Sequence, residues 1–366
     1  MGQSTRLAEL VQERINTFVA SKRTDLEPLG ESIADLLTAA SDFLSGGKRI
    51  RAYCISLGFT ACRELNLTSP LNNDAARVVN AAAALELFHA AALVHDDVID
   101  RSETRRGKPS VHTNFARKHS RSGWRGQAAH FGVAAAILLG DLLQSWADEL
   151  FQEAVDSSEP AAGSRARGHF NRMRTEVAFG QYFDVLEEQQ TTFAPHAEQM
   201  ERATRVLLYK SAKYSVEEPL LIGAALAGAS TELEKTLSGF GVPAGVAFQL
   251  RDDVLGVFGN SAVTGKPSGD DLIEGKRTVL VTLTRKELNT SLRAIFDDVF
   301  GDAEMTSLQL EMLQRTIRET GALDQVEELI AKNMRLAQRF ARSPEVAPAA
   351  VEKLVSLAES MAKRQA

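Results

Sequence analysis

Two short acidic clusters lie at the ends of apolar helical segments, and their spacing suits binding of a divalent cation. The first is His95-Asp96-Asp97-Val98-Ile99-Asp100. Asp96 and Asp100 are four residues apart, so on a helix their side chains project from the same face. Carboxylates are unfavourable at a helix C-terminus. Mg²⁺ takes one or two carboxylates and fills its other positions with water and phosphate oxygens, so this cluster predicts a magnesium site.

The second cluster is Gln249-Leu250-Arg251-Asp252-Asp253, which follows the apolar stretch 242–248. Gln249 lies three residues before Asp252, on the same helix face. Gly256 stands four residues after Asp252, so the helix carries no third acid, and Asp270 and Asp271 follow in a loop. Alone, this cluster would favour a solvated acidic patch. Together with the first, it predicts two helices that present carboxylates across a cavity.

Basic residues lie near both clusters in the sequence, and most such residues are simply surface charges. Beside two acidic clusters they instead indicate a polyanionic ligand, bridged in part by metal and held in part by Arg and Lys. Two diphosphate substrates would fit this division, because only the one that loses its diphosphate needs Lewis-acid stabilisation. The residues concerned are Lys48, Arg51, Arg105, Arg106, Lys210, Lys266 and Lys276.

Helices must position these residues, because nearly every long segment has apolar residues at helical spacing and alternating β-branched runs are nearly absent. Segment 74–100 is apolar all round, which predicts a buried helix whose alanines would line a tunnel for a hydrocarbon tail. Segment 156–168 is rich in Ser, Gly and Pro and is predicted to be an exposed loop. Further helices are predicted over 131–155, 167–190, 197–228, 231–257, 276–300, 303–319 and 323–342.

Composition narrows the class of protein. The 366 residues are 44% hydrophobic and 25% charged, which excludes a disordered chain. The net charge of −6 argues against a nucleic-acid partner. Cys54 and Cys62 are predicted to be reduced core thiols. With no linker, no secretory signal and no apolar run of membrane-spanning length, we expect one domain over 1–366, no transmembrane segment and a cytoplasmic location.

The order of motifs resembles that of the trans-type isoprenyl diphosphate synthases, and most closely their bacterial geranylgeranyl members. The motifs are GGKRIR, FHAAALVHDDVID, TRRGKPS, GQYFDV, YKSAKYS, FQLRDD and GKPSGDDLIEGKRT, between Gly46 and Thr278. The resemblance implies the all-α isoprenoid synthase fold, an antiparallel helix bundle around a deep central cavity. It also implies a homodimer and Mg²⁺, with three ions per active site. Segment 117–130 is longer than is usual in this family and has no assigned role.

The resemblance also implies roles for individual residues. Asp96, Asp100 and Asp252 would bind Mg²⁺, with support from Asp253 and, through water, Asp270. The contacts to isopentenyl diphosphate would be Lys48, Arg51, His89 and Arg106. The contacts to the allylic diphosphate would be Arg105, Lys210, Lys266 and Lys276. Gln249 and Ser211 would lie beside the developing carbocation, and Asp184 would face the cavity. The catalytic set is thus Asp96, Asp100, Arg105, Lys210, Gln249 and Asp252. The glycine at 256, where many members have a third aspartate, leaves open how the third metal is completed.

The expected reaction is head-to-tail condensation of isopentenyl diphosphate with an allylic diphosphate. Ala91 and Ala92, one turn before Asp96, provide no aromatic stop for the tail, and Phe88 is the next bulky residue. This favours geranylgeranyl diphosphate as the product, while farnesyl and longer-chain products stay open. A terpene cyclase is disfavoured because it has no second diphosphate to hold. A non-catalytic subunit is disfavoured because both acidic clusters are present.

Overall fold

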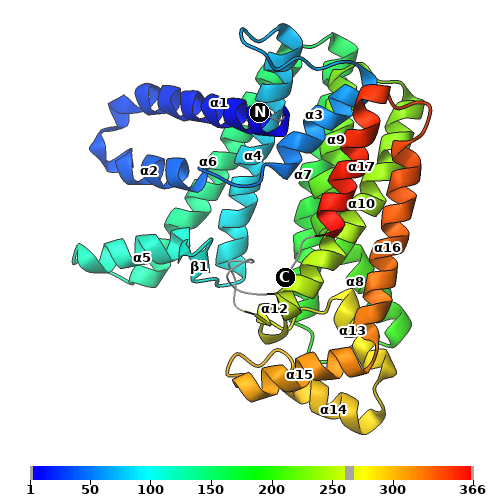
Figure 1. Cartoon of the computed structure of the whole chain (residues 1–366). Helices are drawn as coiled ribbons and strands as arrows, with labels where there is room; N and C mark the ends of the chain where they lie inside the picture. The colour runs from blue at the N-terminus through cyan, green and yellow to red at the C-terminus, as the bar shows by residue number, and fades with distance from the viewer. Residues whose placement is uncertain (1–2, 260–267, 364–366) are drawn as a thin grey trace. The chain divides into compact units, whose positions relative to one another are not determined.

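The computed structural model describes residues 3–259 and 268–363, and these residues are nearly all helical (Figure 1). The one sheet among them is a two-stranded antiparallel hairpin, β1 (Thr104–Arg105) and β2 (Lys108–Pro109). The all-α prediction is therefore confirmed. The described residues group into two compact units, and the single domain stays a prediction. The first unit contains 3–59, 63–166 and 225–228, and the second contains 60–62, 167–224 and the described residues from 229 to 363.

The first unit is built around α4 (Asn73–Ile99), which packs against α6 (Ala128–Asp156) and α1 (Gln3–Asp25). Its side chains at 81–84 are all alanine and all fully buried, so neighbouring helices can approach it closely. The N-cap Asn72 accepts a hydrogen bond from the N–H of Ala75 at 2.8 Å. The buried helix predicted over 74–100 is thus confirmed. The other elements are η1 (Glu27–Leu29), η2 (Glu31–Ile33), α2 (Ala34–Phe43), α3 (Ile50–Cys62) and α5 (Val111–Arg121).

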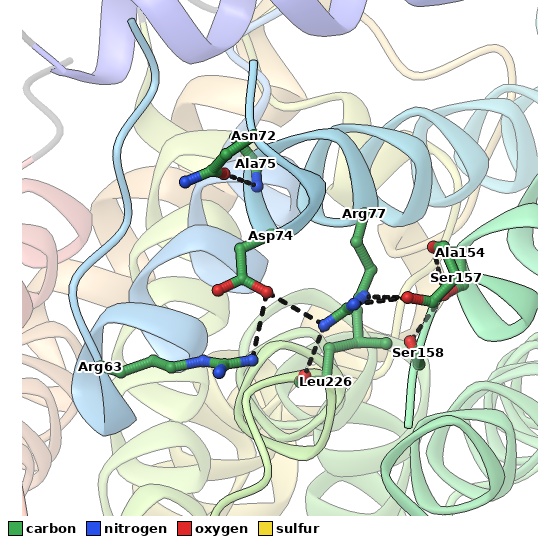
Figure 2. A network of polar contacts seen from close by, with 9 residues as sticks. All are labelled: Arg63, Asn72, Asp74, Ala75, Arg77, Ala154, Ser157, Ser158 and Leu226. Carbon is green, nitrogen blue, oxygen red and sulfur yellow. Dashed lines mark hydrogen bonds and ion pairs between the residues drawn. The ribbon is translucent and has the colours of Figure 1, made fainter. Parts of the chain in front are cut away.

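A buried arginine fixes the start of α4 to the ends of two other helices (Figure 2). Arg77, 9% exposed, donates from Nε to the carbonyl of Ser157 at 3.1 Å and from Nη1 to that of Leu226 at 3.5 Å. Its Nη1 also lies 3.1 Å from Asp74 Oδ1, which Arg63 contacts at 3.2 Å. Ser157 caps α6, and α9 (Glu218–Leu226) ends at Leu226. Carbonyls without helical partners are thereby satisfied by a cation, which also suits the negative end of each helix dipole.

The second unit centres on α10 (Thr231–Phe258), which packs against α16 (Ala322–Ala341) and the π-helix η3 (Leu207–Glu217). Gly241 and Gly245 permit this close packing, because a Cβ at either would lie within 2.7 Å of the backbone of η3. The remaining elements are α7 (Pro160–Glu188), α8 (His196–Val206), α12 (Asp270–Ile273), α13 (Val279–Glu287), α14 (Thr290–Val299), α15 (Ser307–Glu319) and α17 (Pro348–Ala362).

Two secondary-structure predictions were wrong. The loop expected over 156–168 is short, because Pro160 begins α7, a position where proline is tolerated. The helix expected over 276–300 is two helices, because Asn289 caps α14 by accepting from the N–H of Leu292 at 3.0 Å. Both cysteines are free, as predicted; Cys54 is buried and Cys62 is partly exposed.

Two helices, α4 and α6, are long enough and apolar enough to cross a membrane, judged by length and composition alone. In α4, 72% of the most apolar window is buried inside the chain, as in the core helix of a soluble protein; in α6, 28% is buried. No continuous apolar run of this length is present in the sequence, because polar residues such as Glu86 in α4 and Asp141 in α6 interrupt the apolar segments. One or two helices of this kind are a weak indication of a membrane span.

Candidate active site

Both predicted ligands of the first acidic cluster lie at the end of α4. Asp96 is in the last turn, and Asp100 caps the helix by donating its N–H to the carbonyl of Asp96 at 2.8 Å. Their side chains are partly buried, whereas the neighbouring Asp97 is fully buried. Asp96 and Asp100 are therefore accessible to a ligand, whereas Asp97 is enclosed by the protein.

Asp97 is held by Arg105. Its Oδ1 accepts a hydrogen bond from Arg105 Nε at 2.7 Å, and Arg105 Nη2 lies 3.4 Å from Asp96 Oδ2. The β1–β2 hairpin makes this possible, because Arg106 and Gly107 have φ values of 54° and 73° and turn the chain back tightly. Burial raises the pKa of Asp97, although the bond from Arg105 opposes this. Arg105 thus anchors the acidic cluster here, and its contact with an allylic diphosphate stays a prediction.

Two of the four residues predicted to contact isopentenyl diphosphate line a small hollow in the first unit. Its lining includes His89 and Arg106, together with Phe43, Leu44, Gly46, Arg49, Glu86, Ala90 and Leu93. Burial, aided by the charges of Arg51 and Arg106, holds the pKa of His89 well below its ordinary value of 6.5. A neutral imidazole can donate one hydrogen bond to a phosphate oxygen without adding charge.

The turn that carries Lys48 is fixed by a residue that the sequence analysis did not assign. Arg49 is 8% exposed and has the left-handed φ of 50° at the start of α3. Its guanidinium lies 2.8 Å from Glu86 Oε2 on α4 and donates to the carbonyl of Leu44 at 2.7 Å and to Gln12 Oε1 at 2.6 Å. Lys48 itself is exposed. The buried Arg49–Glu86 ion pair holds the turn in place. Lys48 lies exposed just before Arg49, and Arg51 lies just after it in the first turn of α3.

One stripe of α4 is less covered than the rest of the helix. His89, Ala92, Leu93 and Asp96 are partly buried, and their spacing places them on one face. Ala91 is fully buried and projects about 140° away from Asp96 around the helix axis. Among the small residues one turn below Asp96, only Ala92 shares its stripe.

Two bulkier residues lie farther down α4. Phe88 is 5% exposed and projects about 80° away from Asp96, whereas the fully buried Leu85 is almost in line with it. Phe88 is thus beside the stripe and Leu85 is below it.

The second acidic cluster lies on α10. Asp252 is exposed, and Asp253 is 7% exposed and accepts from Gln249 Nε2 at 2.7 Å. Burial, with the negative charges of Asp271 and Asp252, raises the pKa of Asp253 well above its ordinary value. Asp252 is therefore the acid placed to bind a cation, and Asp253 is the acid that Gln249 supports.

Lys210 and Ser211 lie in the π-helix η3, which changes which side chains share a face. Lys210 forms an ion pair with Asp184 of α7. Gly180 allows this approach, because a Cβ there would lie 2.3 Å from the backbone nitrogen of Lys210. Ser211 is 8% exposed. The lysine predicted to contact the allylic diphosphate is thus held beside the acid predicted to face the cavity.

Asp271 is a second residue that the sequence analysis did not assign. A Cβ at Gly256 would lie 1.9 Å from its Oδ2, so its carboxylate occupies the space above that glycine. Asp271 lies in the short helix α12 and not in a loop as predicted. Gly256 is one turn after Asp252, so the Asp271 carboxylate lies on the helix face where the third acid was expected. Lys276 contacts Asp271 at 3.7 Å and Glu274 at 2.5 Å. No local pattern could have found this placement, because it depends on how α12 returns to α10.

The donor set suits a hard cation. Asp96 and Asp100 in the first unit, and Asp252 in the second, offer carboxylate oxygens at helix faces that are not fully covered. Within residues 3–259 and 268–363, no three ligand side chains already converge as a closed metal site. Mg²⁺ does not require one, because water and phosphate complete its octahedron. The residues fit an ion that arrives with a diphosphate.

The two units divide the predicted site residues between them. The first contains Lys48, Arg51, His89, Asp96, Asp100, Arg105 and Arg106, and the second contains Asp184, Lys210, Ser211, Gln249, Asp252 and Lys276. Lys266, predicted to contact the allylic diphosphate, lies outside the described residues.

Comparisons with known proteins show which family this chain belongs to. The family model described as polyprenyl synthetase matches residues 34–317. A geranylgeranyl diphosphate synthase of Methanosarcina mazei is 35% identical over 80% of this chain and 79% of its own length. A geranylfarnesyl diphosphate synthase of Aeropyrum pernix is 33% identical over 80% and 83%. The crystal structure of geranylgeranyl pyrophosphate synthase from Corynebacterium glutamicum, complexed with isoprenyl diphosphate and magnesium, is 33% identical and covers 100% of both chains with a TM-score of 0.91.

Proposed function

We propose that this chain, which belongs to the polyprenyl synthetase family and is a trans-prenyl diphosphate synthase, makes geranylgeranyl diphosphate as its main product. The observation that carries the product assignment is Ala92, the small residue one turn below Asp96 on the same stripe of α4. A tail that passed Ala92 would next come level with the bulk of Phe88, which lies beside the stripe. Relatives named as geranylgeranyl diphosphate synthases support the same length.

A twenty-five-carbon product is the second candidate, and one observation favours it. Phe88 lies beside the stripe rather than on it, and beyond His89 the first large apolar residue in line with Asp96 is Leu85, about 16 Å away along the helix axis. A tail that passed Phe88 would gain about one more isoprene unit. Relatives of similar identity are named geranylfarnesyl diphosphate synthases.

In the proposed reaction, the two diphosphates have different fates and meet different residues. Lys48, Arg51, His89 and Arg106 hold the diphosphate of isopentenyl diphosphate, which is never cleaved. Arg105, Lys210 and Lys276 hold the allylic diphosphate through its oxygens. Charge–charge hydrogen bonds from guanidinium and ammonium groups give both substrates a fixed orientation. This orientation is what turns two dissolved reactants into an aligned pair.

The bond changes follow from that orientation. The allylic C–O bond breaks, and its electron pair leaves with the diphosphate. The double bond of isopentenyl diphosphate attacks the resulting cation, and a proton then leaves the new chain, with the departed diphosphate as its acceptor. Mg²⁺, three ions in the proposed site, supplies charge stabilisation for the leaving diphosphate when bound. Asp96, Asp100 and Asp252 would hold it, while Gln249 and Ser211 lie beside the developing carbocation.

The homodimer and the cytoplasmic location stay predictions. Exposed apolar side chains on α6, Ile137 at 43% and Leu138 at 61%, support a further protein contact on that helix. Light scattering of the purified chain would give its mass directly.

Product analysis of the purified chain tests the proposed function. The chain is incubated with Mg²⁺, isopentenyl diphosphate and each allylic starter, and the dephosphorylated products are separated by length. A dominant twenty-carbon alcohol supports the proposal, and a twenty-five-carbon alcohol supports the second candidate. A fifteen-carbon product refutes the role given to Ala92. No product from the chain alone would indicate a subunit that needs a partner, and a cyclic hydrocarbon would indicate a cyclase.

A further inference from the structure

The segment that leads through the hairpin to α6 carries basic residues beyond those assigned to the active site. Residues 101–127 contain eight Lys and Arg and one acid, Glu103, in a chain whose net charge is −6. Of the eight, Lys118 pairs with Asp35. Arg117, Arg121 and Arg125 are exposed, and no described residue forms an ion pair with them. These three arginines form a local positive surface on a protein that is negative overall.

The end of this segment is an ordered projection. Trp124 lies between two glycines with positive φ, Gly123 and Gly126, so the chain turns sharply on both sides of it. His119, 5% exposed, donates from its Nε2 to the carbonyl oxygen of Arg125 at 3.1 Å, and its ring meets that of Trp124 edge-on at 5.9 Å. The ring of Phe131 packs edge-on against the indole at 5.3 Å and also contacts the ring of His119 at 5.5 Å. The indole is thus supported from within, yet it remains 47% exposed.

A half-exposed tryptophan among unpaired arginines matches one kind of partner best. Indole rings partition to the boundary between water and lipid, and clusters of Lys and Arg bind anionic headgroups. A nucleic acid would be expected to meet several stacking aromatics, and this surface offers one. Figure 1 shows α5 at the edge of the first unit, beside the start of α6.

We propose that this basic tip, formed by Arg117, Arg121, Arg125 and Trp124, docks the enzyme on an anionic membrane surface. The contact is peripheral: the arginines meet headgroup phosphates and the indole enters the interface. None of these residues belongs to the proposed active site, so the inference does not depend on the product.

The test uses sedimentation of the full chain with vesicles of phosphatidylcholine, either pure or with 30% phosphatidylglycerol. We expect binding to the anionic vesicles only, weakening as salt is raised. Replacing all three arginines with glutamine should weaken it on the order of a hundredfold, because each basic residue near the surface contributes about fivefold. Prenyl transfer in solution should be unchanged.

A matched control removes the same charge elsewhere. Lys332, Arg335 and Arg339 are exposed on α16, and no described residue pairs with them. Their triple glutamine variant should bind anionic vesicles as the unmodified chain does. Equal loss in both triple variants would overturn the proposal, because binding would then depend on net charge alone.

Tryptophan fluorescence gives a second readout. The chain has two tryptophans, and Trp146 is 5% exposed against the ring of Phe18, so lipid-dependent changes report Trp124. We expect a blue shift with anionic vesicles that Trp124→Phe abolishes. An unshifted spectrum would overturn the interfacial contact. Tighter binding to RNA than to vesicles, or a change of oligomeric mass in the triple arginine variant, would assign the surface to another partner and refute the proposal.

Discussion

Ala92→Phe should shorten the product. Ala92 lies four residues below Asp96, about 6 Å along the axis of α4, and Phe88 lies about 12 Å below it. A phenyl ring at 92 would therefore raise the floor of the tail by about 6 Å, close to one isoprene unit. Forcing a longer tail against that ring would cost about 1–3 kcal/mol, as overpacking does in a core. The ratio of fifteen-carbon to twenty-carbon product should rise about 5- to 150-fold.

The assay separates dephosphorylated products by chain length at fixed substrate ratio and low conversion. Ala91→Phe is the matched control, because the same ring is added one residue away on a fully buried face of the helix. It should lower the free energy of unfolding by about 1–3 kcal/mol and leave the product ratio unchanged. An unchanged ratio in Ala92→Phe, or an equal shift in Ala91→Phe, would refute the path along this stripe.

Four further predictions concern other parts of the chain. Asp96→Ala should lower kcat more than about a hundredfold with little change in KM and weaken Mn²⁺ binding measured by electron paramagnetic resonance; wild-type turnover would refute the metal assignment. Arg51→Ala should raise KM for isopentenyl diphosphate about 10- to 100-fold, and a selective rise for the allylic substrate would reverse the division of sites. Arg77→Ala should lower the free energy of unfolding in urea by about 3 kcal/mol, since it leaves helix-end carbonyls without a donor; a loss below about 1 kcal/mol would contradict this. Burial raises the pKa of Glu217 above its ordinary 4.5, so its contribution is most favourable below pH 4.5 and is lost as pH rises through the folded pKa. Glu217→Gln should therefore gain stability relative to the unmodified chain between pH 4 and pH 8, and a constant difference would contradict the shift.

Patterns within one helix were predictable from the sequence. The four-residue spacing of Asp96 and Asp100, and the apolar surround of α4, depend only on helix geometry and composition. Each motif is likewise a short local pattern, and the order of the motifs along the chain led to the fold that the comparisons support. Helical spacing alone could not find the π-helix around Lys210, because apolar periodicity does not distinguish an α-helix from a π-helix over so short a segment. The close approach of α7 and α10 to it, at Gly180, Gly241 and Gly245, is a contact between distant segments.

Pairings between distant segments were not predictable. Arg49 and Glu86 are 37 residues apart, and the sequence around neither residue indicates that the two form a buried ion pair. The same holds for Asp271 and Gly256. Such contacts are set by the packing of whole elements, which a single sequence does not contain as a pattern.

The close approach of Asp271 to Gly256 makes the two positions epistatic. A Cβ at position 256 would lie 1.9 Å from Oδ2 of Asp271. An aspartate at 256 would therefore push the Asp271 carboxylate out of its position instead of adding a second carboxylate beside it. Shortening Asp271 first would open the space, and the same aspartate would then be accommodated. The order of the two substitutions therefore decides whether the Asp271 carboxylate has to move aside, and only the path that shortens Asp271 first avoids that displacement.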